Sequence, residues 1–196
     1  MTSVRVLEIM RAAGALKEGH FLLSSGRHSD RYVEKFDLLR RPAETELVCR
    51  GFAERFRADR IDVVAGPTTG GVILAYEVGR QLGCGAAYAE RRAEGSNERE
   101  FRRGTTFPPG SRVLVVDDIL TTGGSVKETL AALVAHPVEI VAAAVLVDRS
   151  GGRVELGVPL HALATLDVAT WDAAECPLCA RGQPLVKPGT TAVIGR

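Results

Sequence analysis

Residues 113–125 read VLVVDDILTTGGS, and their pattern is the strongest signal in the chain. Its four leading apolar residues predict a buried strand that ends in Asp117 and Asp118. A short turn of hydroxyl residues and glycines follows, and the apolar spacing over residues 124–135 predicts a helix. Strands that pass through such turns into helices favour a parallel α/β sheet, in which ligands bind at the carboxyl ends of the strands.

The turn between this strand and helix, residues 121–125, has the composition of an anion site, and we call it the phosphate loop. Backbone N–H groups in the first turn of a helix have no partner within the helix and attract anions. Gly123 and Gly124 allow the backbone to approach a phosphate closely. Hydroxyl donors are available from Thr121, Thr122 and Ser125. The alternative, a turn that only caps the helix, needs one such residue rather than this whole set.

The two carboxylates before the phosphate loop need donors or a cation, because like charges repel and they cannot bond the phosphate. Ribose hydroxyls are donors, and Mg²⁺ bound to a pyrophosphate is a cation. A sugar phosphate that carries a metal-bound pyrophosphate satisfies both needs. The segment therefore predicts a site for such a molecule beside Asp117 and Asp118.

The rest of the chain alternates strand and helix patterns, as a parallel α/β sheet requires. The expected strands are 61–65, 86–89, 112–116 and 140–147, and the expected helices are 4–13, one opening at Pro42, 72–82 and 124–135. Residues 91–110 are polar and have no clear period, which predicts a long loop that is either functional or a disordered, solvated surface segment. Residues from Trp171 onward are rich in proline and glycine and predict an extended tail.

Composition narrows the class of protein. A length of 196 residues fits one domain, and a net charge of +1 gives no case for binding nucleic acid. The longest apolar run, residues 140–147, falls far short of the roughly 20 residues that a membrane helix needs. Charged residues interrupt the N-terminus, so it does not resemble a signal peptide. We expect a cytoplasmic protein without nucleic-acid or membrane partners.

Residues 113–125 closely resemble the 5-phosphoribosyl-1-pyrophosphate (PRPP) motif of type I phosphoribosyltransferases. Other stretches are similar to one branch, the bacterial orotate phosphoribosyltransferases, and these are 19–29, 66–72, 90–104, 147–152 and 175–179. The resemblance implies an α/β fold with a central, mostly parallel sheet flanked by helices. It also implies a single domain with hood elements over about 1–41, a core over about 42–170 and a C-terminal tail over about 171–196.

The resemblance implies an enzyme that transfers the phosphoribosyl group from PRPP to orotate in pyrimidine biosynthesis, with Mg²⁺ held mainly through PRPP. Asp117 and Asp118 would hold the ribose hydroxyls, and the phosphate loop would bind the 5-phosphate. Residues 68–71 would contact pyrophosphate, and we call them the pyrophosphate loop. Its members are Thr68, Thr69, Gly70 and Gly71.

The remaining roles implied by the resemblance concern catalysis and the acceptor base. Arg91 and Arg92 would lie on a mobile loop that closes over the neighbouring subunit's site in a homodimer. Arg149, together with Thr121, would face orotate. A small N-terminal hood over the base would include Ser25, Gly26 and Arg27.

The chain departs from the family pattern at three places, one of which is the Thr68–Thr69 pair, where small apolar residues are commoner. Ser24 stands where many members have a lysine, and the basic residues of the expected loop are all arginines, namely Arg91, Arg92, Arg99, Arg102 and Arg103. Arginine binds phosphate bidentately but is a poor proton donor. Two alternatives therefore stay open, a phosphoribosyltransferase for another base and a PRPP-sensing regulator without turnover. A regulator should carry a basic nucleic-acid face or an added domain, and the sequence shows neither.

Cys176 and Cys179 have the spacing of half a zinc site. The other two cysteines are isolated, so no second pair with this spacing exists. The pair could recruit a histidine or join a pair from another subunit. We favour reduced structural thiols, and we expect His20 and His28 to be structural or surface residues.

Overall fold

The computed structural model of the chain describes residues 1–23 and 25–188. Ser24, at which a lysine is common in the resembling family, lies outside the described residues, as do residues 189–196. The strands are β1 (Leu16–Leu22), β2 (His28–Val33), β3 (Val63–Pro67), β4 (Gly85–Arg91), β5 (Arg99–Phe101), β6 (Ser111–Leu120), β7 (Val138–Asp148), β8 (Leu160–Thr165) and β9 (Thr170–Trp171). The helices are α1 (Ser3–Ala12), α2 (Lys35–Leu39), α3 (Pro42–Phe56), α4 (Gly70–Leu82), α5 (Gly124–Leu133) and α6 (Pro177–Ala180), with a 3-10 turn η1 (Ala173–Glu175).

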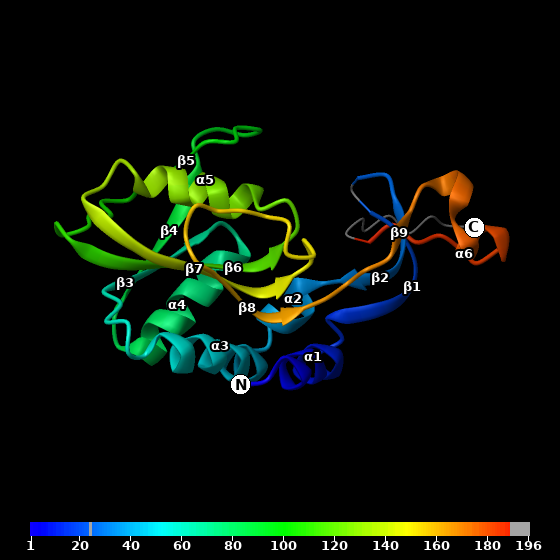
Figure 1. Ribbon diagram of the computed structural model, residues 1–196, viewed down its shortest axis with the longest axis horizontal. Coiled ribbons are helices and arrows are strands. Elements are labelled where there is room, and N and C mark those ends of the chain that lie inside the picture. The colour runs from blue at the N-terminus through cyan, green and yellow to red at the C-terminus, as the bar shows by residue number, and fades with distance from the viewer. Residues whose placement is uncertain (24, 189–196) are drawn as a thin grey trace.

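The larger sheet has the strand order β5-β4-β3-β6-β7-β8 within the described residues. All neighbours in it are parallel except β4 and β5, which pair antiparallel. Helices cover both faces, with α5 on one side and α3 and α4 on the other (Figure 1). The expected α/β fold with a central, mostly parallel sheet and flanking helices is therefore confirmed.

Two apolar layers hold the helices against this sheet. On one face, Phe52 of α3 and Leu74 of α4 pack with Leu114 of β6. On the other face, Leu133 of α5 packs with Val113, the neighbour of Leu114 on the same strand. Successive side chains of a strand point to opposite faces, so β6 must be apolar at nearly every position to be covered on both. This explains the continuous apolar run before the two acids.

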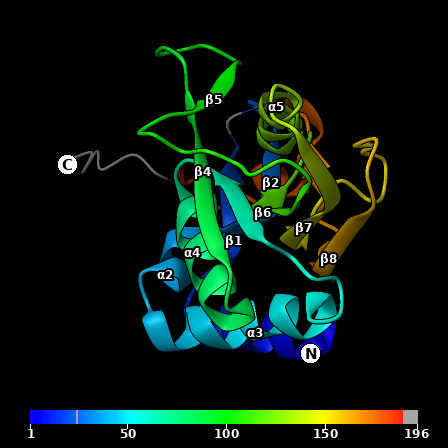
Figure 2. The same cartoon turned by 90° about the vertical axis from the view of Figure 1, so that its left-hand side faces the viewer.

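The structure corrects two boundaries that bear on function. β6 continues to Leu120, so Asp117 and Asp118 belong to the strand instead of following its end. The expected loop over residues 91–110 contains a strand, because β4 reaches Arg91 and β5 pairs with it in an antiparallel hairpin. This hairpin projects beyond the core sheet (Figure 2).

The smaller sheet has the order β1-β2-β9 and lies at the end of the molecule away from β4 and β5 (Figure 1). We call this sheet the hood, after the hood elements expected from the resemblance. β9 joins it from far along the chain, with Trp171 pairing with His28. The described part of the expected extended tail therefore contains η1 and α6 and lies against the hood. The division into hood, core and tail stays a prediction. No helix among residues 1–23 and 25–188 is long and apolar enough to cross a membrane.

Candidate functional site

Asp117 and Asp118 lie side by side at the carboxyl end of β6 and are 6% and 3% exposed. The backbone N–H of Asp118 donates to Asp117 Oδ1 over 2.8 Å, and that of Ile119 donates to Asp118 Oδ1 over 2.7 Å. Lys35 of α2 donates to the same oxygen of Asp118 over 3.0 Å, and its Nζ is 2.9 Å from Oδ2. Lys35 thus compensates the charge of Asp118 and leaves Asp117 without an ion-pair partner among the described residues.

Burial and the neighbouring Asp118 charge together raise the pKa of Asp117 to about 7. Removing the carboxylate from water disfavours its charged form, and a second carboxylate beside it adds repulsion. Lys35 and Arg99 act in the opposite direction but do not reverse the shift. A ligand that brings hydroxyl donors or a cation to Asp117 would relieve this unfavourable charge.

Asp117→Asn is expected to stabilise the ligand-free protein above neutral pH. The pKa of Asp117 is raised on folding, so its contribution to stability is present below its ordinary value of 3.8 and is lost as pH rises toward 7. Asparagine stays neutral, so at pH 8 the variant should melt about 3 °C or more above the wild type, and the difference should be smaller at pH 5, where only part of the contribution has been lost. Calorimetry at the two pH values checks this, with Asp167→Asn, a change at an exposed carboxylate, as control. Equal melting temperatures at pH 8 would contradict it.

The phosphate loop connects β6 to α5 and lines a cleft of about 250 Å³. Gly123 is the N-cap of α5, with φ of 78° in the left-handed region, and its position supplies no side-chain cap. The first N–H groups of α5 therefore lack a side-chain acceptor at the cap. The lining of the cleft includes all five residues of the phosphate loop together with Asp117, Arg91 and Glu128. The predicted phosphate loop and the first acid thus face one cleft.

Gly123→Ala is expected to distort the phosphate loop. Its φ is unfavourable for alanine, and an added Cβ would lie 2.6 Å from Val154 Cγ1. Strain of this kind should raise the KM for PRPP by about 10-fold or more, as steady-state kinetics can measure. Gly157→Ala is the matched control, because its φ of 73° is similar but open space surrounds its Cβ position. An equal effect of both variants on KM would count against a specific role for the phosphate loop.

The pyrophosphate loop lies between β3 and α4 and reaches Asp118. A Cβ on Gly70 would overlap Asp118 Oδ2, so only glycine allows this close approach. The Thr68–Thr69 peptide bond is cis, and Thr68 Oγ1 accepts a hydrogen bond from Arg99 over 3.1 Å. Gly71 packs against Pro67 and Gly66 within the turn. The pyrophosphate loop therefore borders the acids, although it does not line the cleft at the phosphate loop.

Two further clefts adjoin the acids on the side of the hood. One, of about 490 Å³, is lined by Tyr32, Lys35, Asp118, Thr121 and Arg149 among others. The other, of about 430 Å³, is lined by Ser25, Arg27, Tyr32, Thr121, Thr122 and Arg149 among others. Thr121 and Arg149 line both clefts, so the structure brings together the two residues expected to face the acceptor base. We call these two clefts the acceptor clefts, after that expectation.

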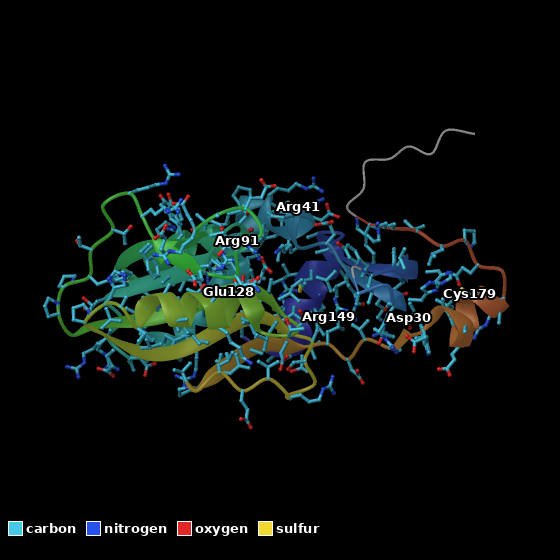
Figure 3. All side chains as sticks on the ribbon, turned by 90° about the horizontal axis from the view of Figure 1, so that it is seen from above. Asp30, Arg41, Arg91, Glu128, Arg149 and Cys179 are labelled. Atoms are coloured by element: carbon cyan, nitrogen blue, oxygen red, sulfur yellow. The ribbon has the colours of Figure 1, made fainter. Side chains whose placement is uncertain are left out.

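Arg149 follows β7 and lies between the core and the hood, with the labelled Arg91 and Glu128 on one side and Asp30 on the other (Figure 3). Its side-chain Nε is buried and has no hydrogen-bond partner among the described residues. Burial lowers the pKa of its guanidinium group from the ordinary value. In the described part of the chain, no carboxylate forms an ion pair with it. An anionic group in these clefts would supply the missing acceptor.

The hood residues are arranged around Arg27. Its guanidinium donates to Thr170 Oγ1 over 3.1 Å, to the Thr170 carbonyl over 2.9 Å and to Asp172 over 2.8 Å. Gly26 has φ of 80° in the exposed turn before it, beside Ser25. Arg27 therefore ties the segment after β8 to the hood while it lines the acceptor cleft.

The arginines expected on the mobile loop separate into three environments. Arg91 lines the phosphate cleft, and its Nη1 donates to the Ser96 carbonyl over 2.7 Å. Arg92 forms ion pairs with Glu98 and Glu100 and lines a different cleft, between β5 and α5. Arg99 is buried instead of lying on a loop, and it pairs with Glu128 over 2.9 Å. Arg91 and Arg92 are the two arginines predicted to act from the mobile loop. Of these two, only Arg91 lines the cleft of the phosphate loop in this conformation.

Sequence reasoning missed three residues that shape the site, Lys35, Tyr32 and Arg99. No spacing or motif marked Lys35, because its contact with Asp118 spans 83 residues. Tyr32 lines both acceptor clefts from the end of β2. Arg99 was interpreted as one of several loop arginines, and only its pairing in the β4–β5 hairpin shows that it supports Thr68 and Glu128.

Comparison with known proteins identifies relatives of this chain. Residues 37–169 match the family described as phosphoribosyl transferase domain. An orotate phosphoribosyltransferase of Caldicellulosiruptor saccharolyticus is 47% identical over 98% of this chain and 100% of its own, and one of Caldanaerobacter subterraneus is 46% identical over 97% and 98%. The crystal structure of orotate phosphoribosyltransferase from Aeropyrum pernix superposes with a TM-score of 0.70 at 31% identity, covering 82% of this chain and 93% of that one.

Proposed function

This chain belongs to the phosphoribosyltransferase family, and from that premise we propose that it is an orotate phosphoribosyltransferase. It transfers the 5-phosphoribosyl group of PRPP to orotate and gives orotidine 5′-monophosphate and pyrophosphate. The single observation that supports this best is the buried acid pair at the end of β6, with the phosphate loop on one side and the unpaired Arg149 on the other. The donor PRPP and the acceptor orotate would meet beside Asp117 and Asp118.

The donor's charges match the residues around the phosphate cleft. Its 5-phosphate would accept hydrogen bonds from the N–H groups and hydroxyls of the phosphate loop. Its ribose hydroxyls would donate hydrogen bonds to Asp117 and Asp118. These hydrogen bonds would stabilise the charged form of Asp117, which burial and the Asp118 charge disfavour. The helix dipole of α5 adds only about 0.3–1 kcal/mol, so these hydrogen bonds supply most of the binding.

The oxygen ligands at the site suit Mg²⁺, which prefers carboxylate and phosphate oxygens. Asp117 has no cationic partner among the described residues, so it retains the capacity to face a hydrated cation carried by PRPP. We propose that Mg²⁺ is held mainly through PRPP and that, when bound, it neutralises charge on the pyrophosphate. Arg91 faces the same cleft and would add a second positive charge near the leaving group.

The reaction breaks the bond between C1 of the ribose and the pyrophosphate oxygen as the orotate nitrogen bonds to C1. Positive charge develops on the ribose and negative charge on the leaving group, so catalysis requires both to be stabilised in a site that excludes water. The buried acids would face the ribose. Arg149 would hold the negative charge of orotate, and Arg27 and Tyr32 would close the cleft from the hood.

A homodimer in the cytoplasm is part of this proposal. The β4–β5 hairpin projects beyond the rest of the sheet (Figure 2), as a segment shared with a neighbouring subunit would. Arg92, which lies outside the phosphate cleft of its own chain, would then act at the partner's site.

The proposal is tested by turnover with defined acceptors. The protein is incubated with PRPP and Mg²⁺ and with orotate, uracil, adenine or hypoxanthine in turn, and pyrophosphate release is followed. Release with orotate alone supports the proposal. Pyrophosphate release only with another base would show that this base, and not orotate, is the acceptor. Binding of PRPP without any pyrophosphate release would indicate a sensor instead of an enzyme.

A further inference from the structure

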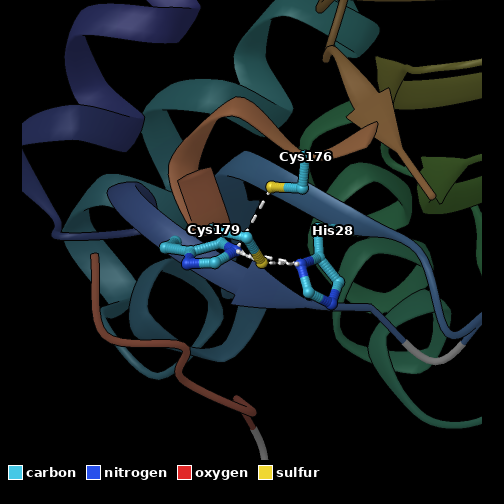
Figure 4. Close-up of side chains that lie close together, drawn as sticks. His28, Cys176 and Cys179 are labelled. Atoms are coloured by element: carbon cyan, nitrogen blue, oxygen red, sulfur yellow. Dashed lines mark hydrogen bonds between the residues drawn. The ribbon is translucent and has the colours of Figure 1, made fainter. Parts of the chain in front are cut away.

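Four potential metal ligands meet inside the hood, away from the acids of β6. They are His20 of β1, His28 of β2, and Cys176 and Cys179, which flank the start of α6. One ligand atom from each residue lies within 4.8 Å of all the others. Three of the residues are buried and Cys179 is exposed. Figure 4 shows Cys176, Cys179 and His28 pointing toward one another.

The separations between these atoms match a tetrahedral zinc centre. Ligands that bind tetrahedral zinc at about 2.0–2.1 Å for nitrogen and 2.3 Å for sulfur lie about 3.3–3.8 Å from one another. His20 Nε2 is 3.0 Å from His28 Nδ1 and 3.4 Å from Cys176 Sγ. Cys179 Sγ is 3.3 Å from His28 Nδ1 and 3.7 Å from His20 Nε2. Only small movements would place all four atoms around one ion.

A backbone contact orients His20 for metal binding. Its Nδ1 is 2.8 Å from the Gln183 carbonyl oxygen, which can only accept, so Nδ1 carries the proton. Nε2 then presents its lone pair to His28, Cys176 and Cys179. An outer hydrogen bond of this kind is the usual partner of a metal-bound histidine, because it fixes the tautomer and the ring orientation.

We propose that His20, His28, Cys176 and Cys179 bind a structural zinc ion. Two sulfur and two nitrogen ligands in tetrahedral positions select zinc over the hard cations Mg²⁺ and Ca²⁺. Binding releases the two thiol protons, and the resulting thiolates balance the charge of Zn²⁺. With four protein ligands the centre has no open position, which assigns it a structural role. On this proposal the cysteine pair recruits His20 and His28, instead of serving only as reduced structural thiols.

The zinc ion would join the two ends of the chain. His20 and Cys176 are 156 residues apart in sequence, and β9 contributes only a two-residue strand to the hood sheet. Small sheets bury little apolar surface and commonly need such a cross-link. His28 follows Arg27, which lines the acceptor cleft. The centre therefore holds the hood in place over that cleft, and its existence does not depend on which base is the substrate.

Metal analysis of the purified full-length protein tests the proposal. Protein isolated without chelators or affinity metals is expected to contain about one zinc ion per chain. Cys176→Ser, Cys179→Ser and His28→Ala should each lose most of it. Cys49→Ala and Cys84→Ser are matched controls at the other two cysteines and should retain it. Protein that lacks zinc and does not take it up from added Zn²⁺, or that holds iron instead, overturns the assignment.

A spectroscopic measurement on the wild type guards against variants that fail to fold. After removal of zinc with 1,10-phenanthroline, added Co²⁺ should produce the intense visible bands of tetrahedral cobalt and the charge-transfer absorption of cobalt–thiolate bonds. The melting temperature should fall on zinc removal and recover on zinc addition. A disulfide between Cys176 and Cys179 in protein prepared under reducing conditions would overturn the proposal. Octahedral cobalt without cobalt–thiolate absorption would overturn it as well.

Discussion

Asp118→Asn should lower kcat/KM for PRPP by about 100-fold or more, because it removes the charge that we propose faces the ribose at the reacting centre. The carboxylate is 3% exposed and is oriented by Ile119 N–H and by Lys35. Asparagine has the same shape and can still accept from the backbone, so the fold should survive. Steady-state kinetics with varied PRPP and saturating orotate give the change, and a thermal melt confirms that the variant is folded.

The control for this variant is Asp167→Asn, which changes the same kind of group at an exposed position outside the described clefts. It should retain wild-type kinetics. Lys35→Gln provides a second comparison, since it removes the partner of Asp118 and leaves the carboxylate in place. Wild-type kcat/KM in a folded Asp118→Asn protein would remove the main support for the proposed donor site.

Arg149→Gln should raise the KM for orotate by about 10- to 100-fold, the effect of losing a charge-assisted hydrogen bond worth about 1.5–3 kcal/mol. Its Nε is buried without a partner in the described structure, so a bound anion would complete its hydrogen bonding. Glutamine keeps a donor but not the charge. The KM for PRPP should change little, because we propose that the donor binds at the phosphate loop instead. The measurement is a pair of saturation curves, one for each substrate.

Arg153→Gln is the matched control, since Arg153 lines the same cleft but is exposed to solvent. Exposed charges are screened by water and contribute little, so its effect on orotate KM should be much smaller. A larger effect at Arg153 than at Arg149, or a change confined to PRPP, would place the acceptor's charge elsewhere.

The donor side of the site could be predicted from the sequence because its parts are neighbours along the chain. The apolar run of β6, the two acids and the phosphate loop follow one another within residues 113–125. Gly83 and Pro42 likewise marked a helix end and a helix start from local backbone preferences, and both are where they were expected. The end of β6 was placed too early, because acids in a strand are unusual and were interpreted as its boundary.

The hairpin of β4 and β5 was missed for a different reason. β5 has three residues, and its charged composition resembles that of a loop. Its strand conformation comes from pairing with β4, and the burial of Arg99 comes from Glu128 and Thr68, which are 29 and 31 residues away. Local propensity cannot report contacts of that kind.

The sequence by itself determined the α/β class, the phosphate loop and the acids beside it, because each depends on adjacent residues and on the period of a strand or helix. Only the three-dimensional packing shows that Lys35 neutralises Asp118, that Arg149 has no ion-pair partner within residues 1–23 and 25–188, and that His20 and His28 meet Cys176 and Cys179. These contacts join residues that are far apart in the chain. They exist only once the strands have paired and the hood has closed, so no pattern within a short window of residues encodes them.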